Sequence, residues 1–189
     1  MAYRYPADTI DFGLWATEFL ADGSEGVFNR LLATSTSAGA SNGNFRGPYF
    51  VCRKSQTITK IRTVVGSTNQ IGATLCRIGL FTADASDNLT LVASTVNDTS
   101  LWATPNAEHD KALSAPYAVV RNQRYAIGML VVGASQAPGL LGFSLGNSAI
   151  GNRSPRTGFL IGSQTDLPSS IATGSMTGSN VMTYAALVP

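Results

Sequence analysis

The stretch Asn97–Asp110 combines Trp102, His109 and three of the eleven acids of this sequence. Trp102 could stack on a sugar ring, with Asp98, Asn106 and His109 as hydrogen-bond partners, because aromatic rings combine a large apolar face with a polar edge. The alternative is that Trp102 folds back to cap one end of the domain, since large apolar side chains seldom stay exposed. The four residues are therefore candidate ligand contacts with a purely structural alternative.

The sequence gives little support for a metal site or for a catalytic site. A metal site would have to combine Asp98, Glu108, His109 and Asp110, but consecutive residues of an extended chain point to opposite faces, and His109 is the one histidine. No GxSxG nucleophile elbow and no phosphate-binding GxxxxGK[ST] motif is present. The eleven carboxylates show no distinguishing pair. The sequence predicts no catalytic residues, no cofactor and no metal, and thus a protein that is not an enzyme.

The composition of the chain narrows the classes of protein to which it could belong. The chain has 189 residues, of which 44% are hydrophobic and 13% charged, as in a packed domain and unlike a disordered chain. The net charge of +2 is too small to predict nucleic-acid binding. No apolar run reaches the roughly 20 residues that span a bilayer, and the N-terminus does not resemble a signal peptide. We expect a chain made in a cytoplasm, without membrane insertion.

The two cysteines, Cys52 and Cys76, lie in separate expected strands. A bridge between neighbouring strands is geometrically allowed. The favoured interpretation is two small buried thiols, because disulfides are rare in a reducing cytosol. The cations are scattered apart from a local cluster at Arg53–Arg62, where alternating strand positions would face solvent.

Runs rich in β-branched and aromatic residues recur with glycine, proline or asparagine turns between them. This pattern predicts an all-β fold, an antiparallel β-sandwich of jelly-roll type with an N-terminal arm. We expect the arm and a linking segment over residues 1–46 and the sandwich over residues 47–189. The expected strands are Tyr49–Arg53, Thr57–Val65, Leu75–Thr82, Leu89–Val96, Ala112–Val120, Arg124–Val132, Gly139–Leu145, Phe159–Gly162 and Val181–Val188.

Some local expectations are more specific. Val27–Thr36 has the spacing of a short helix, but its Thr/Ser run favours a strand. Asn97–Asp110 is expected to be irregular, and Pro116 to lie near the start of its strand. One face of the segment 74–82 should point to the core, and it comprises Thr74, Cys76, Ile78, Leu80 and Thr82.

The N-terminal residues 1–23 combine aromatic side chains with acids. Aromatic residues need a surface against which to bury their large area. Packing on the chain's own domain and docking on a neighbouring molecule are both open.

The segments RIGLFT, NLTLVASTVNDTSLW and KALSAPYAVVRNQRYAIGMLVVG follow one another between Arg77 and Gly133. With ITKI before them, they resemble a β-sandwich domain of minor tail proteins and virion structural proteins in tailed phages of actinobacteria. The resemblance covers roughly Thr57–Val132, and the ending SQTDLPSSI…MTYAALVP is also similar. Asn122 replaces the usual glycine of one turn, and Asn tolerates the same positive φ. Tyr125 after this turn suggests a tyrosine corner, in which the phenol ties the turn to an upstream backbone.

This resemblance implies a phage virion structural protein, a minor tail or tail-tip or fibre module that contacts the host surface. It also implies a homo-oligomer, often threefold, with other tail or capsid proteins as partners and a host surface glycan as a further candidate partner. The expected location is the virion, after synthesis in the host cytoplasm. A capsid decoration protein and a carbohydrate-binding module are the alternatives.

Overall fold

Strands make up most of the regular structure in this computed structural model, which describes residues 20–33, 41–144, 149 and 152–189. All strand pairs in these residues are antiparallel, which confirms the predicted all-β sandwich class. The 3₁₀ turns η1 (Arg30–Leu32) and η2 (Thr173–Ser175) are three residues long. Within the described part of the chain, no helix is long and apolar enough to cross a membrane.

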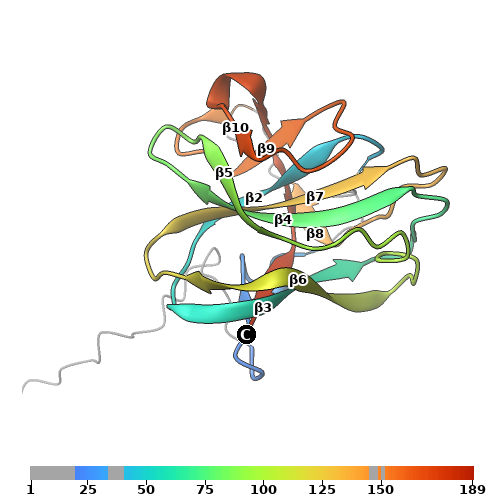
Figure 1. Cartoon of the computed structure of the whole chain (residues 1–189), viewed down its shortest axis with the longest axis horizontal. Coiled ribbons are helices and arrows are strands. Elements are labelled where there is room, and N and C mark those ends of the chain that lie inside the picture. The colour runs from blue at the N-terminus through green and yellow to red at the C-terminus, as the bar shows by residue number, and fades with distance from the viewer. Residues whose placement is uncertain (1–19, 34–40, 145–148, 150–151) are drawn as a thin grey trace, which may run out of the picture.

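Two sheets face each other (Figure 1). The lower layer in that view is the four-stranded sheet, with β1 (Glu25–Gly26), β13 (Ala185–Val188), β3 (Gln56–Val65) and β6 (Ala107–Val119) in this order. The seven-stranded sheet has the order β10 (Ser170–Ile171), β5 (Leu89–Ser94), β4 (Leu75–Ala83), β7 (Arg124–Val132), β2 (Phe45–Val51), β9 (Gly158–Ile161) and β11 (Thr177–Gly178). A small ribbon pairs β12 (Val181–Thr183) with β8 (Gly142–Ser144).

The seven-stranded sheet curls on itself. Its two edge strands, β10 and β11, are separated in the chain by only five residues, 172–176. So short a connection can join opposite edges of one sheet only if the sheet bends round to bring them together. Figure 1 shows β9 and β10 above the layer of β4 and β7, on the side away from β3 and β6.

This curl creates two hydrophobic cores. The main core lies between the two sheets and includes Ile58, Ile61, Ile78 and Ile127. The second core lies on the other face of the seven-stranded sheet and is rich in aromatic rings, with Phe45 contacting Phe81 and Phe159 at centroid distances of 5.5 and 5.2 Å.

The burial of β4 follows from the two cores. Cys76, Ile78 and Leu80 face the main core as predicted, whereas Thr74 is exposed and Thr82 only half-buried, contrary to the prediction. Phe81, which alternation assigned to the opposite face, is fully buried in the second core. A sheet covered on both sides has no solvent face, which is why alternation in this strand is blurred.

Strand β6 departs from its expected bounds. It begins at Ala107, so residues 107–110 are extended rather than irregular, and Pro116 lies well inside the strand rather than near its start. The register with β3 jumps from Ile58–Tyr117 to Lys60–Ala112, which leaves residues 113–116 in a bulge. Proline is accepted there because no ladder donor is needed.

The bulge also joins the two sheets. Leu113 pairs with Thr95, just after the end of β5. The Ser114 hydroxyl donates to the Ser94 carbonyl at 2.7 Å. The four-stranded sheet is thus tied to the seven-stranded sheet along this edge.

The N-terminal part of the described chain belongs to the sandwich. Strand β1 pairs with β13, and Val27 and Phe28 are buried in the main core. Strand β2 starts at Phe45, so the expected division between residues 46 and 47 falls inside this strand. Val27–Thr36 is not a strand in its described portion, which holds η1; residues 34–36 and 1–19 lie outside the described residues.

The turn from β6 to β7 has the predicted tyrosine corner. The Val120 N–H donates to the Tyr125 phenol oxygen at 3.0 Å. Asn122 adopts φ +65°, as a glycine replacement at this position requires.

Cys52 and Cys76 are both buried free thiols, in agreement with the favoured interpretation.

Candidate functional site

A pocket of about 790 Å³ opens beside the end of β2. The pairing of β2 with β9 stops at Pro48–Gly158, and the last contact is the Tyr49 N–H donating to the Thr157 carbonyl at 2.8 Å. Among the described residues, no strand pairs with Val51 on that side. The pocket opens at this point and is lined by Val51 and by the segment before β9.

The ladder geometry leaves a short free edge at this point. Val51 lies opposite Arg124, and the next residue, Cys52, donates its N–H to the Gln123 carbonyl at 3.0 Å. In an antiparallel pair, hydrogen-bonded and non-bonded positions alternate, so Val51 is a non-bonded position relative to β7. Its N–H and C=O consequently point towards the pocket side.

Apolar side chains form most of the pocket's lining. Phe28 and Phe143 meet edge to face with centroids 4.8 Å apart. Val51, at the mouth, is 45% exposed although it is a β-branched apolar residue. The apolar lining consists of Val27, Phe28, Phe50, Val51, Phe143, Pro155 and Met182.

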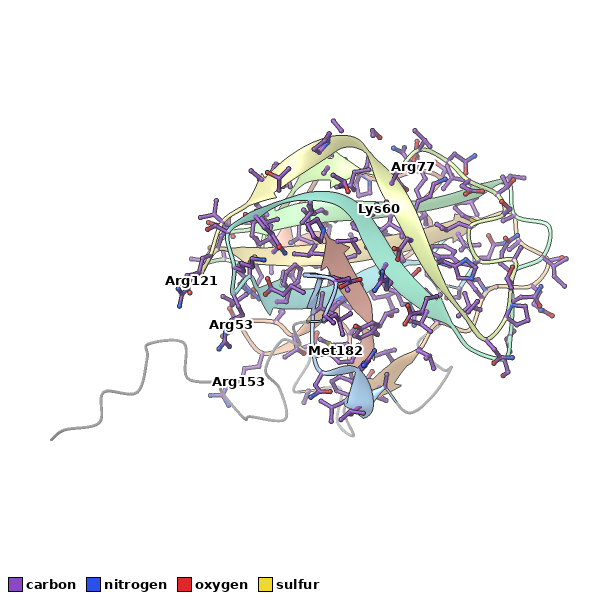
Figure 2. The ribbon with its side chains drawn as sticks, turned by 90° about the horizontal axis from the view of Figure 1, so that it is seen from below. Arg53, Lys60, Arg77, Arg121, Arg153 and Met182 are labelled. Carbon is purple, nitrogen blue, oxygen red and sulfur yellow. The ribbon has the colours of Figure 1, made fainter. Side chains whose placement is uncertain are left out.

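Four arginines surround this apolar surface. Arg53 follows β2, Arg121 lies in the β6–β7 turn, Arg124 begins β7, and Arg156 lies in the segment before β9. No carboxylate is among the described residues that line the pocket. Figure 2 shows Arg53 and Arg121 along the same edge of the molecule, followed in that view by Arg153. The pocket therefore combines an apolar interior with a positively charged rim.

The buried carboxylate of Asp87 holds two of these arginines in place. It accepts a short hydrogen bond from Arg124 Nη1 and another from the Arg156 backbone N–H at 3.2 Å. Burial of Asp87 opposes ionisation, but the hydrogen bonds from Arg124, Ser154 and the Arg156 backbone together outweigh it, so the pKa of this carboxyl lies below its ordinary value. Arg124 also lies over the Tyr49 ring, 4.4 Å from its centroid. The rim is thus pre-organised by ion pairing and stacking.

Glu25 fixes the other side of the rim. Its carboxylate accepts from the Arg53 backbone N–H at 2.7 Å and from the Cys52 thiol at 3.4 Å. Burial raises the pKa of the Cys52 thiol to about 11, so it remains protonated and acts as a donor. The end of β2 is therefore anchored to the N-terminal segment that carries β1.

Trp102 is not available to a ligand. Its side chain has no exposed surface, and its indole N–H donates to the buried Thr63 hydroxyl at 2.9 Å. This finding contradicts the sugar-stacking interpretation of Trp102 and agrees with the alternative, in which the ring caps the core.

The other three predicted contact residues are placed separately. Asp98 accepts from Lys111 Nζ at 2.7 Å and from the Ser100 hydroxyl at 2.7 Å. His109 Nε2 donates to the Thr104 carbonyl at 3.0 Å, and the Asn106 N–H donates to the Gly66 carbonyl at 2.8 Å. These residues hold turns and strand ends, and none of them lines a described pocket.

Glu108 and Asp110 lie beside a cation rather than around a metal. Asp110 binds Arg62 through two hydrogen bonds, of 2.6 and 2.9 Å, and a further bond of 2.9 Å joins Arg62 to Asp22. Arg62 is thus largely covered by its partners, contrary to the expected solvated face. Among the described residues, no group of three His, Cys, Asp or Glu side chains could hold a metal ion.

The sequence pattern did not point to the pocket. Its cations were interpreted as scattered surface charges because they are distant in the chain. The one available signal was the pair of arginines in the RNQR turn, next to the tyrosine corner.

Neither a comparison with protein-family models nor one with curated proteins finds a match to this chain, so the pocket is interpreted from its own geometry.

Proposed function

We propose that this chain is a structural protein of a phage virion, a minor tail, tail-tip or fibre module that contacts the host surface. Under this proposal it works as a homo-oligomer bound to other virion proteins. Its task is to build and present a stable surface, and it carries out no reaction.

One observation carries the proposal. The motifs on which the resemblance to actinobacteriophage tail proteins depends lie on successive strands, with ITKI on β3, RIGLFT on β4, LTLVAS on β5 and RYAIG on β7. These strands form the two facing layers of the sandwich. The tyrosine corner at Tyr125 shows that the turn before RYAIG forms as the sequence predicts. A similar order of strand motifs along the chain favours a common architecture.

The alternatives differ in what supports them. A carbohydrate-binding module loses its main argument, because Trp102 is buried. A capsid decoration protein would use the same β-sandwich in another place on the particle. Location on the virion is therefore the property that separates the leading proposal from this alternative.

Immunogold electron microscopy of purified virions, with an antibody against this chain, tests the proposal. Label at the tail tip or along the fibres is the expected result. Label over the capsid would replace the tail assignment by a decoration role. Particles that carry no label, and no peptide of the chain in their mass spectra, would overturn the structural proposal.

A further inference from the structure

The pocket beside β2 sets three requirements for whatever binds there. The occupant must offer apolar groups to Phe28, Phe50 and Met182. It must carry negative charge for the arginine rim. It should also present backbone hydrogen-bonding groups, because the N–H and C=O of Val51 point to this side without a neighbouring strand. An extended acidic peptide with aromatic side chains meets all three.

We propose that residues 1–19 of the chain bind in this pocket, either in their own molecule or in a neighbouring copy. This segment contains five aromatic residues, which are Tyr3, Tyr5, Phe12, Trp15 and Phe19. Its acids, Asp8, Asp11 and Glu18, outnumber its single cation, Arg4. Charge and apolar character both complement the pocket.

The described chain begins close to the pocket. Glu25 accepts a hydrogen bond from the Arg53 backbone at the rim, and Leu20 precedes it by only five residues. Five residues span at most about 17 Å. The 19 residues before Leu20 could extend about 60 Å, so reach does not limit binding in the same molecule. The same length suffices to cross to an adjacent molecule in an oligomer.

The energetic argument comes from area and charge. Binding of one aromatic side chain removes on the order of 150 Å² of apolar surface from water, which favours docking. The Arg124 guanidinium is already held by Asp87, and the Arg156 guanidinium by the Met176 carbonyl at 2.9 Å, so both lose little freedom when an acid approaches. The proposal concerns the chain's own assembly and does not depend on a role in a virion.

The two tryptophans make the proposal testable in the full chain. Trp102 is buried, so its emission reports the core. Trp15 lies in the proposed peptide, and the difference between the wild type and the Trp15→Phe variant isolates its signal. We expect that signal to be blue-shifted and quenched by acrylamide several-fold less than free tryptophan amide.

A matched pair of variants distinguishes the pocket from any other site. Val51→Glu places a negative charge at the mouth, and Val96→Glu makes the same change at an exposed valine outside the pocket lining; the two side chains are 45% and 57% exposed. Val51→Glu should shift the Trp15 emission to the red and raise its quenching several-fold, and Val96→Glu should leave both unchanged. Arg121→Glu, at an exposed position of the rim, provides a second variant with the same expected effect if Val51→Glu fails to fold.

Dilution identifies the source of the bound segment. A Trp15 signal that is independent of concentration means docking in the same molecule, and one lost in step with dissociation of the oligomer means docking in a neighbour; both support the proposal. A Trp15 signal that is fully quenched in the wild type, or one that responds equally to Val51→Glu and Val96→Glu, would overturn it. Neither result bears on the location of the chain in a virion.

Discussion

The indole N–H of Trp102 depends on a single acceptor, the hydroxyl of Thr63, in a fully buried part of the core. Thr63→Val keeps the side-chain shape but leaves this donor unpaired. We therefore expect the free energy of unfolding to fall by about 1–3 kcal/mol, measured by urea denaturation. In a Trp102→Phe background the same substitution should lower the free energy of unfolding much less, because no buried donor is left without an acceptor. An equal loss in both backgrounds would show that the hydrogen bond does not stabilise the fold.

Asp98 predicts a measurable pH dependence. Hydrogen bonds from Lys111 and then Ser100 lower the pKa of its carboxyl to about 2, below the ordinary value of 3.8. A pKa lowered on folding stabilises the protein at pH values above 3.8, and this contribution disappears as the pH falls from about 4 to 2. Asp98→Asn should therefore lower stability at neutral pH by about 1 kcal/mol, the usual scale for a partly exposed pair. Between about pH 4 and pH 2, the free energy of unfolding should change less with pH in the variant than in the wild type. An equal pH dependence in the two proteins would contradict the assignment.

At the scale of elements, β7 and β2 approach closely because a glycine lies under an aromatic ring. A Cβ added at Gly128 would lie 1.9 Å from the Phe45 ring, which cannot move away because it packs against Phe81 and Phe159. Gly128→Ala should cost about 3 kcal/mol in the free energy of unfolding, through overpacking of the second core. Gly174→Ala is the matched control, since its Cβ would meet no atom within 4 Å. Similar losses in the two variants would rule out this explanation.

Strands differed in how well the sequence predicted them. Arg124–Val132 was predicted with its observed bounds, because a long run of β-branched and apolar residues between two turns favours one strand. Strand β6 was predicted too short at its start, because Glu108, His109 and Asp110 look like a loop. They are extended because β6 is the edge of its sheet, where one side of the strand faces water and charged side chains are accommodated.

At the scale of the whole molecule, β13 connects the first and last parts of the described chain. It lies between β1 and β3 in the four-stranded sheet, and Leu187 is fully buried in the main core. Leu187→Ala should lower the free energy of unfolding by about 2–5 kcal/mol, as expected for a buried leucine. Val96→Ala, at an exposed position, should change it by less than about 0.5 kcal/mol. Thermal or urea unfolding would measure both, and comparable losses would show that β13 does not hold the sheet together.

The sequence by itself determined the class of the fold and the positions of several strands, such as Arg124–Val132. Strand propensity, turn residues and the tyrosine corner are local properties, carried by neighbouring residues such as Val120, Asn122 and Tyr125. They can be read without knowledge of the tertiary structure. The buried thiols of Cys52 and Cys76 were expected on another ground, because disulfides are rare in a reducing cytosol.

Only the tertiary structure decided which residues meet. The pocket combines segments near residues 27, 50, 122, 156 and 182, and no local pattern indicates that these converge. The curl of the seven-stranded sheet likewise depends on the pairing of β10 with β5 at one edge and of β11 with β9 at the other. Trp102 looked available in the sequence because it is buried by the main core, and its hydrogen-bond partner Thr63 lies 39 residues away. Contacts between residues distant in the chain arise from the packing of whole sheets, and so the pocket came from the folded molecule alone.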